Sequence, residues 1–153
     1  MRDSPTAGPR LRAALIALDD RGRILALKHV RPNSEYWVLP GGGVETGETV
    51  EKGLEREVNE ELGIGCRIEK LLAIGELMAP SRHVVDFFFA GTLERHDGFE
   101  IRHSEGIGEA RWVRPPKLSE MDFRPKEIIP MLEGLSNGTW NAPIYLGKYN
   151  YTP

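Results

Sequence analysis

The sequence predicts a single α/β domain. Several runs of β-branched and aromatic residues are separated by one strongly periodic helical run, and a second helical run follows near the end of the chain. With 153 residues, of which 40% are hydrophobic and 28% charged, the chain is long enough for one core and too short for two. We expect the domain over residues 11–135, a flexible leader over 1–10, and an irregular tail over 136–153 that packs on the same domain.

The first third of the chain is predicted to be mainly β-structure. Leu11–Leu18 and Ile24–Val30 are strand-like runs, and the Asp and Gly residues of segment 19–23 provide the turn chemistry of a hairpin. A short strand, Tyr36–Leu39, leads into the glycines at 41–43. Glycine allows positive φ and close approach to a ligand, so we expect a functional loop there.

A helix is predicted from Thr49 to Leu62. Thr49 is a suitable N-cap, and Gly63 stands where a helix stop is expected. Two strands should follow, Ile68–Met78 and His83–Leu93. The second contains three consecutive phenylalanines, at positions 87, 88 and 89, which favour a place in the core over stacking on a base.

The last elements are expected to be short. Residues 94–108 are polar and contain glycine, which indicates a loop, and Ala110–Val113 is predicted to be a strand. Pro125–Leu135 is predicted to be a helix with Pro125 near its first turn and with a kink or break at Pro130.

Composition excludes several classes of protein. The net charge is −3 and no basic stretch is long enough to follow a phosphate backbone, so we expect no long nucleic acid as partner, while small phosphorylated ligands remain allowed. Segment 1–10 lacks the apolar core of a signal peptide, and no run approaches the roughly 18 apolar residues of a membrane span. The single Cys66, expected to be a small buried hydrophobe, fits a reducing compartment. We expect a cytoplasmic protein without membrane attachment.

The helix over 49–62 carries acidic residues on its interior face. On a wheel of 100° per residue started at Val50, Glu61 falls at about 20° and Glu57 at about −20°, whereas Glu60 falls at about −80°. The apolar stripe that these glutamates join or border consists of Leu54, Val58 and Leu62.

Carboxylates crowded on one helix repel one another, and burying them costs several kcal/mol unless positive charge is supplied. Arg56 is one cation and offsets only part of this charge. A hard divalent cation such as Mg²⁺ would offset the remainder, because it prefers oxygen ligands. A solvated acidic face is the common explanation of such a charge run, but the position of Glu61 argues against it.

A longer motif surrounds these glutamates. Gly42 is followed after five residues by Glu48, and after seven more by Arg56-Glu57-Val58-Asn59-Glu60-Glu61-Leu62-Gly63-Ile64. This segment, 42–64, resembles the Nudix box at all nine constrained positions. The flanking segments 37–42 and 109–113 also resemble those of Nudix hydrolases. The resemblance implies an α/β/α sandwich with a mixed β-sheet, and hydrolysis of a diphosphate linkage in a nucleoside diphosphate derivative.

The resemblance also implies a metal site. It assigns Mg²⁺, with Mn²⁺ as a substitute, to the glutamates at Glu57, Glu60 and Glu61 and to the backbone carbonyl of Gly41. Structural support of the box falls to Gly42 and to a charge-assisted hydrogen bond between Glu48 and Arg56.

The general base differs among branches of the family. A box glutamate such as Glu57 is one candidate, and an acid in the loop before the last strand is the other. That loop offers Glu100, Glu105 and Glu109, of which Glu105, beside Gly106, is our preferred loop candidate.

Other polar and aromatic residues have less specific roles. Lys28 and Arg31 precede the glycines and are candidates for binding phosphate oxygens, with a solvated strand edge equally open. The four histidines, at positions 29, 83, 96 and 103, lack metal-ligand spacing and are expected to be non-catalytic. Trp140 and the tail tyrosines could close over a base or pack in a homodimer interface, and both roles stay open.

We expect the substrate to be a small nucleotide. A nucleoside triphosphate, oxidised or not, that yields a nucleoside monophosphate and pyrophosphate is our first candidate. ADP-ribose or a nucleotide sugar is the alternative, since Pro80 lies sixteen residues after Ile64, where branches of the family that cleave ADP-ribose often carry a proline. A non-catalytic nucleotide-binding domain is a second alternative, which intact box glutamates disfavour. An isomerase of isoprenoid diphosphates on the same fold is disfavoured for the same reason.

Overall fold

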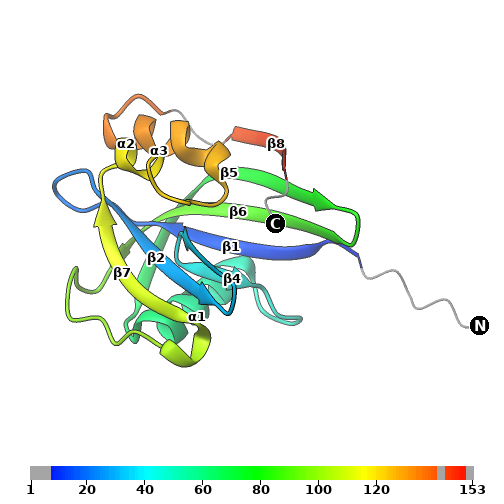
Figure 1. The fold of residues 1–153 in the computed structure, drawn as a ribbon, viewed down its shortest axis with the longest axis horizontal. Coiled ribbons are helices and arrows are strands. Elements are labelled where there is room, and N and C mark those ends of the chain that lie inside the picture. The colour runs from blue at the N-terminus through cyan, green and yellow to red at the C-terminus, as the bar shows by residue number, and fades with distance from the viewer. Residues whose placement is uncertain (1–7, 141–143, 151–153) are drawn as a thin grey trace, which may run out of the picture.

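The computed structural model of the chain describes residues 8–140 and 144–150. Most of the predicted leader and the last residues of the tail lie outside them. Two β-sheets lie between α1 on one side and α2 with α3 on the other (Figure 1). The strands are β1 (Arg10–Ile16), β2 (Ile24–Arg31), β3 (Ser34–Val38), β4 (Gly41–Gly43), β5 (Cys66–Ala79), β6 (Arg82–Leu93), β7 (Ile107–Val113) and β8 (Ile144–Asn150). The helices are α1 (Val50–Leu62), α2 (Pro115–Leu118), α3 (Ile129–Ser136) and the 3-10 turns η1 (His103–Glu105) and η2 (Lys126–Ile128).

The larger sheet is mixed, as predicted. Its five strands run in the order β4-β1-β6-β5-β8, and the smaller sheet has the order β3-β2-β7. Strand β1 pairs antiparallel with β4 and parallel with β6. The α/β/α sandwich with a mixed β-sheet is therefore confirmed.

The predicted hairpin turn between the first two strands forms, but the strands do not continue as a paired hairpin. The turn forms, because the Asp19 carboxylate accepts hydrogen bonds from the backbone N–H groups of Arg21 and Arg23. The Asp19 and Leu25 N–H groups donate to the Arg23 and Ala17 carbonyl oxygens, and Leu18 bridges Ile24. Beyond these contacts, β1 and β2 belong to different sheets. The turn residues determine the local reversal, whereas the pairing of each strand is determined by partners far along the chain.

Helix α1 has the predicted limits. The Thr49 side chain accepts a hydrogen bond from the Lys52 N–H, and Gly63 ends the helix in the left-handed conformation with φ 67°. Three apolar residues of its interior stripe are fully buried against the larger sheet: Leu54, Val58 and Leu62. This packing fixes which acidic residues of α1 face inward.

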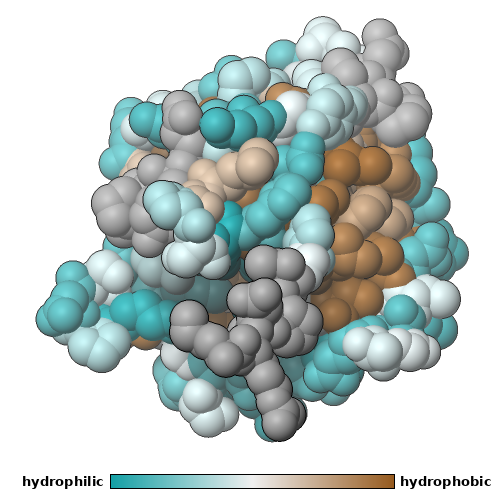
Figure 2. All heavy atoms as spheres, turned by 90° about the vertical axis from the view of Figure 1, so that its right-hand side faces the viewer, coloured by the Kyte–Doolittle hydropathy of each residue, from teal (hydrophilic) through white to brown (hydrophobic). Residues whose placement is uncertain are grey.

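The core lies on both sides of the larger sheet. Phe88 packs toward α3, and Phe89 packs in the cluster beneath α1. Both are buried, in agreement with the prediction, while Phe87 is half-buried and lines an apolar groove with Val50 and Leu71 beside the start of α1. Figure 2 shows that apolar side chains gather on one side of the molecule.

One prediction near the end of the chain is confirmed and another is corrected. The helix expected over 125–135 is broken near Pro130, as predicted, and is divided into η2 and α3. Pro130 lies in the first turn of α3, where its missing N–H has no helical partner to lose. The expected irregular tail contains strand β8, which pairs parallel with β5 and extends the larger sheet. The described helices include none that is both long and apolar enough to cross a lipid bilayer.

Candidate active site

Glu61 is the buried carboxylate of α1. Only 5% of its surface is exposed, and its Oε1 accepts a hydrogen bond of 2.7 Å from the Gly41 N–H. Burial raises the pKa of Glu61 above its ordinary value, and the Gly41 bond opposes this only in part. The His29 Nε2 lies 3.9 Å from Oε2, too far for a hydrogen bond, and has no other partner among the described residues.

Glu57 lies one turn before Glu61 and is partly buried. Burial is the main cause that raises the pKa of Glu57, the negative charge of Glu61 adds to it, and a hydrogen bond from Arg56 opposes it. Two neighbouring carboxylates on α1 are thus held where their charged forms are disfavoured. This arrangement is suited to the capture of a cation.

The glycine loop makes room for these carboxylates. A Cβ at Gly42 would lie 2.4 Å from the Glu57 Cδ, so the absence of a side chain there leaves the space that Glu57 fills. Gly42 does not have a positive φ, whereas Gly41 has φ 147° and would bring a Cβ within 2.1 Å of the Ala13 carbonyl oxygen. The conformational requirement that we expected for the loop therefore falls on Gly41, and Gly42 is required for space.

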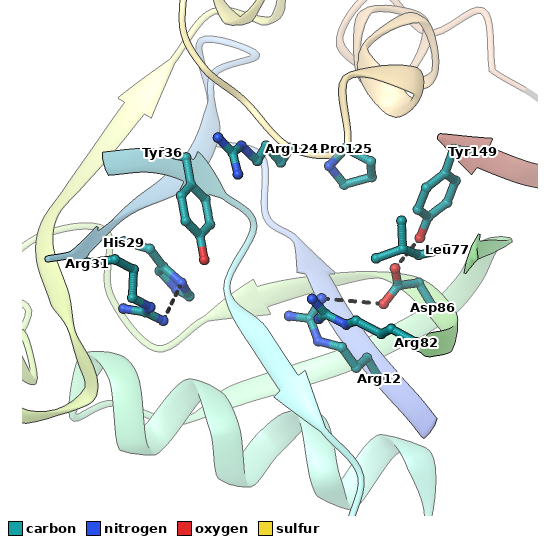
Figure 3. A pocket seen from close by; sticks show the side chains of 10 residues that line it. All are labelled: Arg12, His29, Arg31, Tyr36, Leu77, Arg82, Asp86, Arg124, Pro125 and Tyr149. Carbon is teal, nitrogen blue, oxygen red and sulfur yellow. Dashed lines mark hydrogen bonds and ion pairs between the residues drawn. The ribbon is translucent and has the colours of Figure 1, made fainter. Parts of the chain in front are cut away.

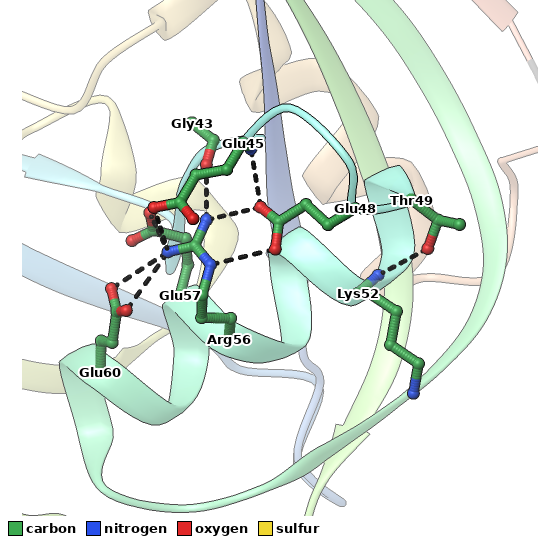
Figure 4. Close-up of polar contacts among 8 residues, drawn as sticks. All are labelled: Gly43, Glu45, Glu48, Thr49, Lys52, Arg56, Glu57 and Glu60. Atoms are coloured by element: carbon green, nitrogen blue, oxygen red, sulfur yellow. Dashed lines mark hydrogen bonds and ion pairs between the residues drawn. The ribbon is translucent and has the colours of Figure 1, made fainter.

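Arg56 connects the loop to the helix (Figure 4). Its guanidinium donates to both carboxylate oxygens of Glu48, at 2.7 and 3.1 Å, and to the Gly43 carbonyl oxygen at 2.9 Å. It also donates to Glu57 at 3.1 Å and to Glu60 at 3.2 Å. The Arg56 hydrogen bond holds the pKa of Glu48 below its ordinary value. One cation therefore braces the loop and orients two glutamates of α1.

The predicted metal ligands are suited to a divalent cation but do not all converge. Glu57 and Glu61 face the glycine loop, whereas Glu60 is exposed and turned to Arg56. Among the residues that the structure describes, no three acidic, histidine or cysteine side chains are arranged to hold a metal ion. The oxygen donors of Glu57 and the buried Glu61 nevertheless suit a hard divalent cation.

A pocket of about 250 Å³ opens between strands of the two sheets (Figure 3), and one of its lining residues, His29, lies 3.9 Å from Glu61. Strands of both sheets and the segment after α2 contribute to it. Its lining residues are Arg12, His29, Arg31, Tyr36, Leu77, Arg82, Asp86, Arg124, Pro125 and Tyr149. His29 links the pocket to Glu61, because the same side chain lies next to both.

Of the two predicted phosphate-binding residues, only Arg31 lines the pocket. Its guanidinium donates to the Val30 and Gly106 carbonyl oxygens and lies 3.2 Å from His29 Nδ1. Lys28 points to the other side of β2, where it pairs with Glu35 at 3.6 Å and Glu109 at 4.0 Å. Alternation along a strand explains the difference, since residues 29 and 31 share one face.

A buried polar network closes one end of the pocket. Asp86, with 5% of its surface exposed, accepts a hydrogen bond from the Tyr149 hydroxyl and lies 3.6 Å from the Arg12 guanidinium. Burial raises the pKa of Tyr149, so the phenol stays a donor. Tyr149 lies on β8, in the segment predicted to be an irregular tail. Trp140 instead packs against the apolar cluster next to α3, and Tyr145 is exposed and donates to Glu76.

The candidate base in the loop lies apart from these contacts. Glu105 is exposed on η1, and no hydrogen bond or ion pair connects it with α1 among the described residues. Glu100 lies next to Gly63, at the end of α1, and Glu109 pairs with Arg111 and Lys28. The sequence also did not suggest Arg12, Arg82 or Arg124 as site residues; they come from three separate elements.

Comparison with known proteins identifies the family and the fold of the chain. The model of the NUDIX domain family matches residues 8–132. A MutT-like protein of Streptomyces ambofaciens is 34% identical over 139 residues, which cover 90% of this chain and 83% of that protein. An ADP-ribose pyrophosphatase of Methanocaldococcus jannaschii is 30% identical over 128 residues, 79% of this chain and 72% of the relative. The crystal structure of a NUDIX hydrolase from Nitrosomonas europaea shares the fold with a TM-score of 0.73 at 24% identity, covering 95% of this chain and 81% of that one.

Proposed function

The chain belongs to the Nudix family and is a hydrolase of phosphorus-containing anhydrides in nucleotide derivatives, and we propose that its substrate is a nucleoside triphosphate. Hydrolysis of this substrate yields a nucleoside monophosphate and pyrophosphate. The observation that supports a diphosphate-cleaving site here is the burial of Glu61 beside Glu57, next to a pocket lined by arginines. Acidic groups of this kind bind the metal, and cations near them bind substrate phosphates.

The metal site in this proposal consists of Glu57, Glu60, Glu61 and the Gly41 carbonyl. When bound, Mg²⁺ supplies charge neutralisation of the diphosphate and lowers the pKa of an attacking water. The Gly41 N–H fixes one oxygen of Glu61, and Arg56 fixes the direction of Glu57 and Glu60. These contacts orient the carboxylates before substrate arrives, which reduces the cost of ordering them during the reaction.

Glu57 is the general base that we favour. Its partial burial and the neighbouring Glu61 charge both raise its affinity for a proton. Glu105 is the alternative acceptor, although it is exposed on η1. The variants E57Q and E105Q distinguish the two candidates. The variant that lacks the base loses the acidic limb of the pH–rate profile, and the other variant retains it.

ADP-ribose or a nucleotide sugar is the second candidate substrate. The relative from Methanocaldococcus jannaschii supports it by name, and Pro80 in the turn between β5 and β6 is compatible with it. The pocket supports the triphosphate instead, since its four arginines face a single aspartate and a triphosphate carries more negative charge than ADP-ribose.

Product analysis tests the proposal. The enzyme is incubated with Mg²⁺ and each of a panel of nucleoside triphosphates, nucleotide sugars, ADP-ribose, dinucleoside polyphosphates and NADH, and the products are separated. We expect nucleoside monophosphate and pyrophosphate from a triphosphate. A kcat/KM for ADP-ribose at least tenfold above every triphosphate, about 1.4 kcal/mol of transition-state preference, would reverse the order of the two candidates.

A further inference from the structure

The pocket beside Glu61 contains more positive charge than the cleaved linkage requires. Its lining includes four arginines and one carboxylate. This inference rests on the proposed function, in which a metal ion bound by the carboxylates neutralises the diphosphate that is cleaved. The arginines therefore need another anion.

Two of the four arginines are committed to protein groups. Arg31 donates to two backbone carbonyl oxygens and contacts His29. Arg124 pairs with Asp122 through two bonds of 2.9 Å and lies over the ring of Tyr36, 4.4 Å from its centroid. Their guanidinium groups contribute positive potential, but many of their N–H donors are already used.

The other two arginines retain donors that can bind a ligand. Among the residues that the structure describes, Arg12 makes one ion pair, at 3.6 Å to Asp86, which is beyond hydrogen-bond distance and leaves its N–H groups available. The Arg82 side chain forms no hydrogen bond or ion pair with residues 8–140 or 144–150. Figure 3 shows the two side chains next to each other at the end of the pocket near Asp86.

Asp86 does not neutralise this pair. Its carboxylate is buried and already accepts the hydrogen bond of Tyr149. It can hold Arg12 in place, and Glu61 also interacts electrostatically with Arg12, but neither carboxylate pairs with Arg82 among the described residues. Arg82 is exposed, so solvent screens part of the repulsion between the two guanidinium groups, and a bound anion would remove the rest. Guanidinium groups match the oxygens of a phosphoryl group better than those of a neutral sugar or base.

We propose that Arg12 and Arg82 bind a phosphoryl group additional to the two joined by the cleaved linkage, with Asp86 and Tyr149 positioning Arg12. The substrate class is then a nucleotide with at least three phosphoryl groups. The third extends the phosphate chain, as in a triphosphate, or stands on a ribose, as in a 2′-phosphorylated dinucleotide. A diphosphate that carries only neutral groups lacks the ligand of this subsite.

Binding without metal isolates the subsite. In EDTA, isothermal titration calorimetry compares ATP with ADP and NADPH with NADH, two pairs whose members differ by one phosphoryl group. In one pair or both, we expect wild-type protein to bind the ligand with the additional phosphoryl group at least about tenfold more tightly, about 1.4 kcal/mol. In R82A this preference should fall below about threefold, because the added phosphoryl group loses its fork of donors.

R67A is the matched control. It removes the same charge from an exposed side chain of β5 that pairs with Glu69 outside the pocket, and the preference should persist. The inference would be overturned if wild-type protein bound none of the four ligands detectably or showed a preference below tenfold in both pairs. It would also be overturned if the preference persisted in R82A or was lost equally in R67A. Turnover of the same ligands with Mg²⁺ is scored separately. Its absence alongside an Arg82-dependent preference would overturn the proposed function and not this subsite.

Discussion

Gly42→Ala should lower activity by about 10²-fold while the protein remains folded. A Cβ at Gly42 would lie 2.4 Å from the Glu57 Cδ and 2.5 and 2.7 Å from its two oxygens. Since non-bonded carbon atoms prefer about 3.5–4.0 Å, the carboxylate must move by roughly 1 Å or more. Misplacement by about 1 Å can cost on the order of 10²-fold in rate, or about 2.7 kcal/mol. We expect that loss in kcat/KM.

The stability of this variant should change little. Glu57 is the far end of a flexible side chain and can swing toward solvent, so we expect a loss of about 1 kcal/mol in unfolding free energy. Gly41→Ala differs, because its Cβ would meet the Ala13 backbone at 2.1 Å and disturb the pairing of β1 with β4. Gly43→Ala is the control, since the nearest atom to its Cβ is an Arg10 guanidinium nitrogen at 3.4 Å.

The assay combines Mg²⁺-dependent hydrolysis with thermal melting for the three variants. The G42A protein should melt near wild type and lose about 10²-fold in kcat/KM. The G41A protein should melt much lower, and the G43A protein should keep both properties. Retention of more than half of wild-type activity by folded G42A would refute the reasoning that Glu57 must occupy the space beside Gly42.

Three further predictions concern single side chains. In EDTA, E61Q should melt at a higher temperature than wild type at pH 8 and at the same temperature as wild type at pH 4. Burial raises the Glu61 pKa above its ordinary 4.5, so the charged form destabilises the fold only above that pH. Equal melting temperatures at pH 8 would contradict this. R56K should lose about 1–3 kcal/mol in urea unfolding, because lysine cannot reproduce the paired bonds to Glu48; unchanged stability would show that the bonds are dispensable. Iodoacetamide should label Cys66 slowly at pH 8, since burial raises its pKa to about 11 and leaves about one thiol in 10³ ionised; labelling as fast as free cysteine would exclude the shift.

Local signals predicted the helix and its buried acid. Capping residues and apolar spacing define α1 within the chain itself, and the same spacing places Glu61 among Leu54, Val58 and Leu62. Strand content was also predictable over β5 and β6, where β-branched and aromatic residues are dense.

Long-range pairing could not be derived in the same way. Nothing near the turn at 19–23 indicates that β1 and β2 enter different sheets, and the tail gives no regular alternation that would reveal β8. The arginine pocket depends on this pairing, because β6 brings Arg82 and Asp86 beside Arg12 on β1. One signal was present but unused: His29 and Arg31 are two apart on a strand and must share a face.

The most direct test of the carboxylate site is the Mg²⁺ dependence of nucleotide hydrolysis in wild type, E57Q and E61Q. Initial rates on the best triphosphate are measured from EDTA to saturating Mg²⁺, with circular dichroism to verify folding. We predict no wild-type turnover in EDTA, full turnover with Mg²⁺, and a kcat lower by about 10² or more in both folded variants. Wild-type turnover that persists in EDTA, or either variant above half of wild-type activity at saturating Mg²⁺, would contradict the assignment of Glu57 and Glu61 to the metal site.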